Sequence, residues 1–268
     1  MNVFANIPAL TQQKYVRIGQ LFVPPSQITT TLSRYAHTLV CKNPYEKFPY
    51  TFRGTLTAFC LNGRYFSVFC QHQIKDYSPD QVILIPRSSN YAKQISGGRF
   101  YSIAPNASND DEEFTDVCAI EFEPDKYRIE NLRSEFFPVV LDECWPSNSL
   151  GHIIALGFPT CSNDWKYSEF DQESRLTEMN SNTFIVMVRH LGGSQARYVQ
   201  EAKITRNNSF PADGMSGGPV FHLGKDVSGF FVGLAGMIQR GSNTSDNFRF
   251  IDMDFLRRFA EMCLSQTR

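Results

Sequence analysis

Short runs of apolar residues recur along most of the chain, and turn-forming residues separate them. Gly, Pro, Asn, Asp and Ser fill the intervals between the runs. Strands of this length and spacing are typical of all-β barrels and sandwiches rather than of alternating strand and helix units. The eleven predicted strands span 55–61, 64–70, 81–86, 99–105, 116–123, 137–141, 152–158, 183–190, 198–205, 218–223 and 231–239.

The first two runs are joined by the segment LNGRY, which places Asn62 and Gly63 between them. Both residues adopt positive φ readily, as a two-residue hairpin turn requires. We therefore predict that 55–61 and 64–70 form an antiparallel hairpin.

Two segments show the spacing of apolar residues that is typical of a helix. The clearer one covers 252–265 and begins at Asp252, a residue that can cap the first turn. We expect this helix to pack on a barrel through one apolar face. A second candidate covers about 25–37, and the strand pattern breaks between 125 and 150, where we expect a linker. The apolar face of the first candidate consists of Phe255, Leu256, Phe259, Met262 and Cys263.

Length and composition fit a globular β-rich protein. The 268 residues suffice for one large domain or for two modules that share a core, and the 23 Phe and 11 Tyr residues favour strands. The formal net charge of −1 gives no basic field for nucleic acid or for an anionic membrane surface. No apolar run reaches transmembrane length, and the first residues do not resemble a signal peptide. We therefore expect neither nucleic acid nor a membrane as a partner.

Seven cysteines lie at irregular intervals, and no two of them form a CxxC pair. The odd number and the spacing argue against a disulfide framework and against a zinc site. Reduced thiols are typical of intracellular proteins. We expect a cytoplasmic location and no metal or other cofactor. The cysteines are Cys41, Cys60, Cys70, Cys118, Cys144, Cys161 and Cys263.

The segment DGMSGGPVF, residues 213–221, surrounds one serine with three glycines and a proline. One interpretation is a simple turn, because Gly reaches positive φ at little cost and Pro fixes the next φ. The other interpretation is chemical. Glycines allow backbone N–H groups to converge beside the hydroxyl of Ser216, where a developing anion would be stabilised.

A nucleophilic serine needs a base that takes its proton. Among the five histidines, His72 ends the second strand of the predicted hairpin, where a rigid strand meets a polar loop. The alternative interpretation is an ordinary loop histidine. The other histidines are His37, His152, His190 and His222.

The base in turn needs a third group that orients it. Asp116 stands at the start of a predicted strand, so it can be partly buried and accept a hydrogen bond from an imidazole. The alternative interpretation is a turn former at the start of that strand. Asp110 and Asp111 compete for the same role, but they lie in a charged loop without a strand to hold them.

Taken together, the order His72, Asp116, Ser216 and the GxSGGP motif resemble the chymotrypsin-like, or trypsin-like, serine proteases. The resemblance covers roughly residues 50–255, including the hairpin before the histidine, the aspartate segment, the strand IIALGFP and the serine loop. It implies an all-β fold of two six-stranded antiparallel β-barrels with a C-terminal α-helix. Residues 1–135 would hold an N-terminal extension and the first barrel, and residues 136–268 the second barrel and the helix, as one protease unit.

The resemblance also implies a role for each site residue. His72 would act as general base and then as general acid, and Asp116 would fix its tautomer. Ser216 would attack the carbonyl carbon of the substrate. The backbone N–H groups of Gly214 and Ser216 would form the oxyanion hole.

Two positions depart from the pattern of many secreted members of this family. Met215 stands where an Asp would pair with a newly cleaved amino terminus, and Gln73 stands where a disulfide-forming Cys would follow the histidine. In these respects the chain looks more like intracellular bacterial or HtrA-type proteases, without a PDZ module. No acid is placed to receive Lys or Arg, so we expect cleavage after a small or uncharged residue. The implied pocket residues are Phe210, Ala235, Gly236 and Met237.

The sequence thus predicts a serine endopeptidase that acts on a protein or peptide substrate in a reducing compartment. Because an unrestricted protease would be hazardous to its host, we also expect narrow specificity, a regulatory protein partner or a restricted substrate. The alternative is a catalytically weak or inactive pseudoprotease that serves as a protein-binding module. Cys70 and Gln71 favour the alternative, because the family usually has small residues ahead of the histidine. Residues 1–50 lie outside the family core and are available to a partner. An esterase is disfavoured because the acid precedes the serine.

Overall fold

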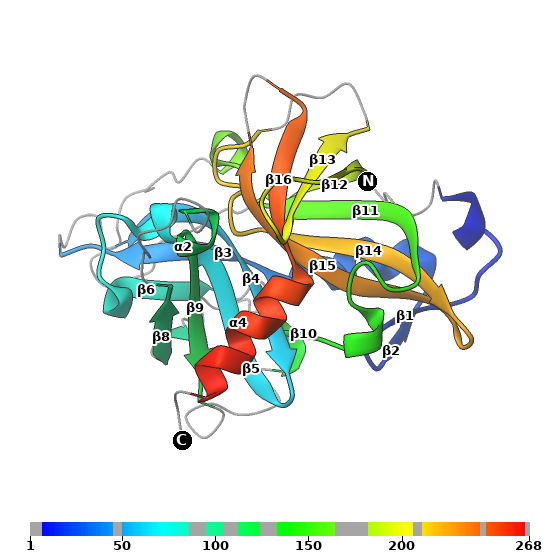
Figure 1. Cartoon of the computed structure of the whole chain (residues 1–268), viewed down its shortest axis with the longest axis horizontal. Helices are drawn as coiled ribbons and strands as arrows, with labels where there is room; N and C mark the ends of the chain where they lie inside the picture. The colour runs from blue at the N-terminus through cyan, green and yellow to red at the C-terminus, as the bar shows by residue number, and fades with distance from the viewer. Residues whose placement is uncertain are drawn as a thin grey trace, which may run out of the picture.

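The computed structural model arranges the chain in two large β-sheets that lie side by side, with the C-terminal helix across their junction (Figure 1). Each sheet contains eight strands within the part of the chain that the structure describes. The described residues are 7–44, 50–85, 95–96, 98–103, 112–123, 133–163, 182–205, 211–241 and 245–265.

Six strands of the second sheet close into a barrel. They follow the order β14-β11-β12-β13-β16-β15, and β15 pairs back with β14 to complete the ring. All six pairings around the ring are antiparallel. The strands are β11 (Ser149–Gly157), β12 (Phe184–Gly193), β13 (Val199–Ile204), β14 (Pro219–Asp226), β15 (Gly229–Gly241) and β16 (Asn247–Asp252).

The first sheet forms a half-barrel. Its strands follow the order β7-β6-β3-β4-β5-β9-β8, and β10 pairs in parallel with β4. The predicted hairpin is confirmed, because Asn62 (φ 52°) and Gly63 (φ 77°) form the turn between β4 and β5. The strands are β3 (Ala36–Lys42), β4 (Tyr50–Leu61), β5 (Arg64–Cys70), β6 (Val82–Ile85), β7 (Ile95–Ser96), β8 (Arg99–Ser102), β9 (Val117–Phe122) and β10 (Phe137–Pro138).

The predicted fold class is therefore confirmed as a nearly all-β double barrel with a C-terminal helix, one barrel being closed and the other being half-closed. The division of the chain at residues 135 and 136 stays a prediction.

Two short strands near the N-terminus belong to the second sheet, although the sequence analysis predicted no strands there. Strand β1 (Val16–Ile18) runs parallel to β15, and β2 (Leu21–Val23) pairs with β1. Arg17 of β1 forms ion pairs with Glu143 at 2.7 Å and with Asp226 at 2.5 Å. Each of these strands has three residues, too few to show an alternating pattern, so only their tertiary pairing reveals them.

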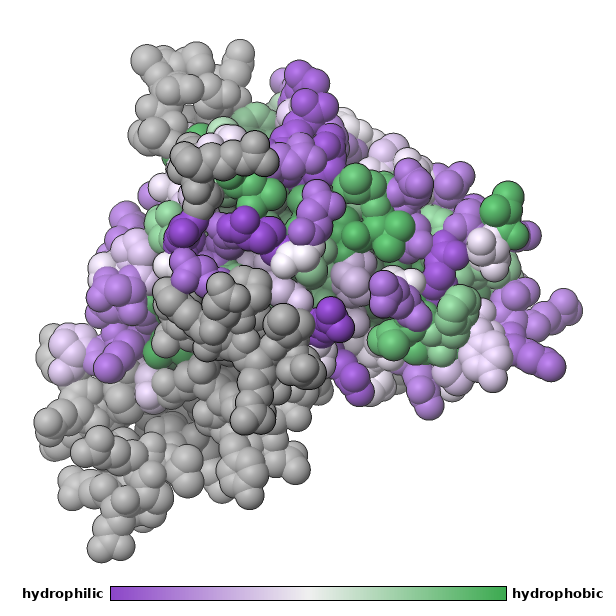
Figure 2. Space-filling model, turned by 90° about the horizontal axis from the view of Figure 1, so that it is seen from below, coloured by the Kyte–Doolittle hydropathy of each residue, from purple (hydrophilic) through white to green (hydrophobic). Residues whose placement is uncertain are grey.

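Some apolar side chains reach the surface. Figure 2 shows the molecule from below, where apolar residues form separate green patches among polar ones. In strand β2, Leu21 is 48% exposed and Phe22 is 64% exposed. Single apolar residues at the surface are common in folded proteins, and we assign no role to these two.

Helix α4 (Met253–Ser265) begins at the predicted cap, because the carboxylate of Asp252 accepts a hydrogen bond from the Phe255 N–H at 3.2 Å. The predicted apolar face needs one correction. Met262 is 45% exposed, and Met253 and Ala260 belong to the buried side of the helix instead. The buried residues of α4 are Met253, Leu256, Phe259, Ala260 and Cys263.

The second predicted helix, over 25–37, is shorter than expected. Helix α1 covers Ile28–Leu32 with a 3₁₀ turn on either side, and Ala36 already begins β3. A further short helix, α2 (Glu112–Thr115), precedes β9. Within the described residues, no helix has the length and apolar character needed to cross a membrane.

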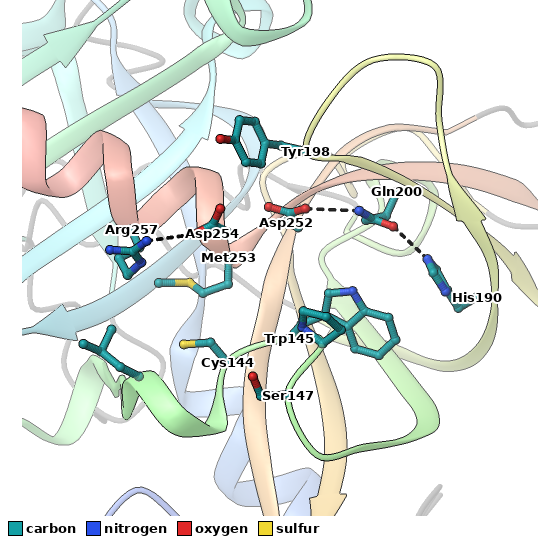
Figure 3. Close-up of a pocket in the computed structure, with 12 residues that line it drawn as sticks. Cys144, Trp145, Ser147, His190, Tyr198, Gln200, Asp252, Met253, Asp254 and Arg257 are labelled. Carbon is teal, nitrogen blue, oxygen red and sulfur yellow. Dashed lines mark hydrogen bonds and ion pairs between the residues drawn. The ribbon is translucent and has the colours of Figure 1, made fainter.

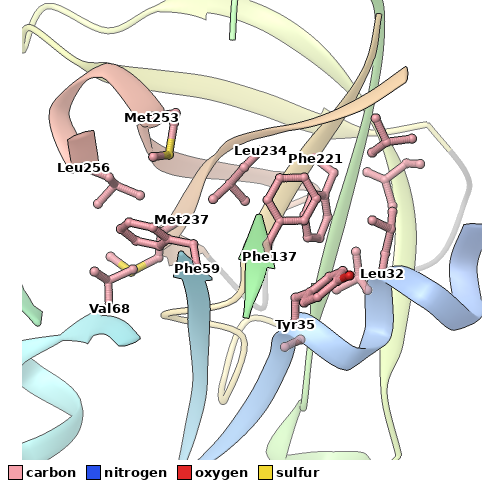
Figure 4. Packing of buried hydrophobic residues seen from close by; sticks show 14 of the residues in the cluster. Leu32, Tyr35, Phe59, Val68, Phe137, Phe221, Leu234, Met237, Met253 and Leu256 are labelled. Carbon is pink, nitrogen blue, oxygen red and sulfur yellow. The ribbon is translucent and has the colours of Figure 1, made fainter. Parts of the chain in front are cut away.

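One hydrophobic cluster connects the two sheets and α4 (Figure 4). Phe59 of β4 and Val68 of β5 belong to the same cluster as Leu234 and Met237 of β15 and Leu256 of α4. Burial of this shared apolar surface stabilises the sheets against each other. The two barrels therefore form one packed unit.

Two histidines lie inside the fold in their neutral form. The Nε2 atom of His37 lies 2.8 Å from the carbonyl of Glu135, and that of His222 lies 2.7 Å from the carbonyl of Glu143. Burial lowers the pKa of each imidazole to about 4, against a smaller upward effect of the hydrogen bond. An exposed imidazole in the unfolded chain has a pKa near 6.5.

We expect protonation of His222 to contribute measurably to the pH dependence of the free energy of unfolding. In the unfolded chain His222 takes up a proton as the pH falls through about 6.5, whereas in the folded chain its pKa is about 4. The contribution of neutral His222 to the free energy of unfolding is therefore complete above pH 6.5 and is lost as the pH falls toward 4. From pH 7.5 to pH 5 the wild type should lose about 2 kcal/mol more than His222→Gln. Urea unfolding of both proteins at both pH values measures this difference, and equal losses would contradict it.

Candidate active site

The pairing of β5 with β9 brings the predicted base and acid together. Strand β5 ends at Cys70, opposite Val117, and the 3₁₀ helix η5 (Gln71–Ile74) follows immediately. The Gln71 N–H donates to the carbonyl of Asp116 at 2.6 Å, which extends the ladder by one step. His72 and Asp116 are therefore neighbours although 44 residues separate them along the chain.

The carboxylate of Asp116 holds the His72 ring in one orientation. Nδ1 of His72 lies 2.9 Å from Oδ2 and 3.0 Å from Oδ1, and the backbone N–H of His72 donates to Oδ1 at 3.0 Å. The Asp116 side chain is 10% exposed, whereas that of His72 is 46% exposed. Within the described residues, Nε2 of His72 forms no hydrogen bond, so this nitrogen is available to a reacting group.

The serine loop joins β15 of the second sheet and contacts β4 of the first. Gly217 N–H donates to the carbonyl of Ile238 at 2.7 Å, and Ile238 N–H donates to the carbonyl of Gly218 at 2.8 Å. From the other side, the hydroxyl of Thr57 donates to the Gly217 carbonyl at 2.7 Å. The hydroxyl of Thr55 likewise donates to the Gly214 carbonyl at 2.7 Å. The loop is thus fixed between the two sheets.

The glycines around the serine are required by close backbone contacts. Gly217 has φ of +83°, and a Cβ there would overlap the carbonyl oxygen of Thr55. A Cβ at Gly218 would overlap the carbonyl oxygen of Leu156 in β11. Only glycine allows the serine loop to approach both sheets this closely.

Gln73 connects the histidine helix with the serine loop. Its side chain is buried, and its Nε2 lies 2.9 Å from the Ser216 carbonyl and 3.0 Å from the Thr55 carbonyl. Its Oε1 accepts the Cys70 N–H at 2.7 Å. In the sequence, Gln73 is notable only as a residue that replaces a cysteine, because a sequence does not show which backbone groups a side chain contacts.

The backbone N–H groups of the predicted oxyanion hole differ from those of neighbouring residues in their hydrogen bonding. Met215, Gly217 and Gly218 donate their N–H groups to backbone carbonyls. Within the described residues, the N–H groups of Gly214 and Ser216 have no such acceptor. Two free donors in adjacent turns can bind a developing oxyanion.

The structure brings His72 and Asp116 into direct contact, and it brings the backbone of Ser216 to the neighbouring Gln73. Within the described residues, the Ser216 hydroxyl forms no hydrogen bond with the His72 ring. Such contacts are often long in the absence of substrate and shorten when it binds.

The predicted pocket residues that the structure describes do not line an open surface. Ala235 and Met237 are fully buried in hydrophobic clusters. Gly236 pairs with Val220 and Asp252 in the neighbouring strands. Phe210 lies outside the described residues. A role of these four positions in a substrate pocket stays a prediction.

A cysteine adjoins the histidine and the aspartate. The Cys70 thiol, a ring nitrogen of His72 and a carboxylate oxygen of Asp116 lie within 4.8 Å of one another. These atoms are of the kinds that bind transition metals. No second cluster of this kind occurs among the described residues.

A separate cavity of about 640 Å³ lies beside the start of α4 (Figure 3). Nε2 of His190 lies 2.9 Å from the Gln200 side-chain oxygen, and the Gln200 amide donates to Asp252 at 3.1 Å. Burial raises the pKa of Asp252. None of the predicted site residues lines this cavity. Its lining residues are Leu141, Cys144, Trp145, Pro146, Ser147, His190, Tyr198, Gln200, Asp252, Met253, Asp254 and Arg257.

Comparison with solved structures identifies the fold. The chain is similar to a thermostable serine protease, AL20, from an extremophilic microorganism, with a TM-score of 0.51 and 12% sequence identity over 88% of this chain and 99% of that one. A structure from work on the Sesbania mosaic virus VPg protein has a TM-score of 0.44 and 14% identity over 84% of this chain and 95% of that one. No protein-family model and no curated protein sequence matches the chain.

The chain therefore has the fold of a chymotrypsin-like double β-barrel, as solved serine proteases do. At 12% identity this likeness shows the fold alone. Activity has to be argued from the residues of the site.

We expect the Gln73 amide to be the main polar contact between the histidine helix and the serine loop. Gln73→Met would remove the amide from the Thr55 carbonyl and from the Cys70 N–H, and it would leave the Ser216 carbonyl only the longer hydrogen bond from the Thr55 N–H at 3.3 Å. It should therefore lower the free energy of unfolding by about 2–4 kcal/mol. The matched control is Gln71→Met, an exposed position of the same short helix, which should change stability by less than about 0.5 kcal/mol. Urea unfolding curves measure both, and similar small losses would refute the role of the amide.

Proposed function

We propose that this protein is a serine endopeptidase in which His72, Asp116 and Ser216 form the catalytic triad. The observation that carries this proposal is the His72–Asp116 contact of 2.9 Å next to a serine loop that is fixed between two barrels. A buried carboxylate that orients a half-exposed imidazole is the arrangement that general-base catalysis needs.

In the proposed mechanism, Nε2 of His72 takes the hydroxyl proton as Oγ of Ser216 forms a bond to the substrate carbonyl carbon. The carbonyl π electrons move to the oxygen, and the N–H groups of Gly214 and Ser216 stabilise the resulting oxyanion. The imidazolium then gives its proton to the leaving amine. Water repeats the sequence to release the acyl group from Ser216. Asp116 stabilises the imidazolium in both halves.

The proposed enzyme works in a reducing compartment of the cell. All seven cysteines are free thiols, which supports a reducing compartment such as the cytoplasm. Gln73 provides hydrogen bonds where secreted relatives carry a disulfide-forming cysteine, and Met215 cannot pair with a new amino terminus. These features support a protease of intracellular, HtrA-like character. Restricted substrates or a regulatory protein partner belong to the proposal for a different reason, namely that an unrestricted protease would damage its own compartment.

One observation favours a second candidate, a pseudoprotease that binds proteins. Within the described residues, the Ser216 hydroxyl has no hydrogen bond to the base that would activate it. In this alternative the barrels serve as a binding module, and the serine stays unreactive even when a partner is bound.

A fluorophosphonate probe separates the two candidates. The probe forms a covalent bond with a serine that is activated by a base, so we expect it to label the wild type and not Ser216→Ala or His72→Ala. The control is Ser228→Ala, a change in the exposed turn between β14 and β15, which should label like the wild type. A wild type that stays unlabelled, both alone and in the presence of binding partners, would favour the pseudoprotease.

Replacing the orienting acid tests the second member of the triad. Asp116→Asn keeps the shape of the side chain but no longer stabilises the imidazolium or fixes the Nδ1–H tautomer, so kcat should fall by about 10⁴-fold with little change in KM. The expected size of the loss is that of the same substitution in the chymotrypsin-like triad, and hydrolysis of a peptide substrate measures it. A loss below about tenfold would assign Asp116 a structural role only.

A further inference from the structure

The third member of the cluster, Cys70, has no part in the proposed proteolysis. Its side chain is fully buried two residues before His72. Its thiol lies 3.7 Å from the carbonyls of Ile238 and Gln239, at the limit of a sulfur hydrogen bond. The thiol therefore sits between β15 and the His72–Asp116 pair.

The three side chains come from rigid parts of the fold. Cys70 is the last residue of β5 and lies opposite Val117 of β9, the residue directly after Asp116. The Cys70 N–H is bound by Gln73 and the His72 N–H by Asp116. The backbone thus holds one sulfur, one nitrogen and one oxygen donor close together without a bound ion.

This donor set matches zinc in type and comes within about 1 Å of it in spacing. Zinc binds sulfur at about 2.3 Å and nitrogen or oxygen at about 2.0–2.2 Å, so the donors of a tetrahedral site lie about 3.3–3.6 Å apart. The Nδ1 of His72 and Oδ2 of Asp116 are now 2.9 Å apart, and all three donors lie within 4.8 Å of one another. Movements of about 1 Å would complete the three-donor set. The exposed side of His72 leaves room for water as the fourth ligand.

We propose that Cys70, His72 and Asp116 bind a zinc ion, and that this binding switches the active site off. The binding itself is independent of the proposed protease function, whereas the inhibitory effect rests on it. In this proposal the ion acts as an exchangeable regulator.

The proton balance explains the inhibition. When zinc binds, the Cys70 thiol releases one proton to solvent and becomes a thiolate. Asp116 binds as the carboxylate that it already is. Zinc takes the lone pair of His72 Nδ1, so the ring proton moves to Nε2. An imidazole with its proton on Nε2 cannot accept the proton of Ser216, and the base is lost.

The spacing of the cysteines argues against a zinc site that is built from several cysteines. It does not bear on a site that uses a single cysteine, such as the one inferred here. A site of this kind uses only one cysteine, and its other two ligands lie on a helix and on a strand start that the fold brings beside it.

Titration with zinc and with cobalt(II) tests the site directly. Wild type should bind one zinc ion, measured by calorimetry, and the cobalt complex should show the absorption band of a cobalt–thiolate bond. Cys70→Ser and Cys70→Ala should bind at least about tenfold more weakly and lack the band. The control is Cys161→Ser, which removes the exposed thiol and should leave binding and band unchanged.

His72→Ala tests a second ligand in case the Cys70 variants fail to fold. The His72 side chain is half-exposed, so its loss should weaken zinc binding without disturbing the core. Ser216→Ala contains all three ligands and should bind zinc like the wild type. Binding that is equally strong in the Cys70 variants and the wild type, or a cobalt complex without the thiolate band, would overturn the proposal.

Hydrolysis of a peptide by the wild type and by the Cys70 variants, each compared with its own metal-free rate, then separates the two proposals. Wild type should be inhibited by zinc at concentrations that fill the site, and the Cys70 variants should need at least about tenfold more. A protein that binds zinc through Cys70 but never hydrolyses peptide would refute the protease and leave the metal site in place. An active protease that zinc does not inhibit would refute the switch alone.

Discussion

A buried amide, the side chain of Gln73, joins the parts of the site that the chain delivers from two sheets. Its nitrogen meets the carbonyls of Thr55 and Ser216, and its oxygen accepts the N–H of Cys70. A displacement of the serine loop from the histidine helix would break the buried hydrogen bond between Gln73 and the Ser216 carbonyl, and a buried polar group that loses a partner costs more than its hydrogen bond gains in net terms. The relative position of the proposed base and nucleophile therefore depends on a side chain that has no chemical role of its own.

The two halves of the site are built by different kinds of interaction. The His72–Asp116 pair is a product of register within one sheet, because the β5–β9 ladder ends next to it. The serine loop is a product of docking between sheets, because hydroxyl donors on β4 hold its carbonyls and glycines allow the approach. Hydrogen bonds thus bridge the two sheets at this site.

The same imidazole nitrogen links the two proposals. Proteolysis requires that Nδ1 carry a proton toward Asp116, so that Nε2 can accept one from the serine. Metal binding requires the lone pair of Nδ1 and reverses the tautomer. The two states exclude each other, and Cys70 adds the donor that a pair of histidine and aspartate alone would lack. Regulation by a cation would then need no conformational change larger than about 1 Å.

The sequence by itself determined the features that follow from local rules. Positive φ at Asn62 and Gly63 specifies the β4–β5 hairpin, and the spacing of apolar residues after Asp252 specifies α4. Tertiary structure alone decided the pairing of β1 with β15, the contacts of Gln73 and the burial of Met237, because each depends on partners far away in the chain. A sequence states which donors, acceptors and apolar groups exist. Register and packing decide which of them meet.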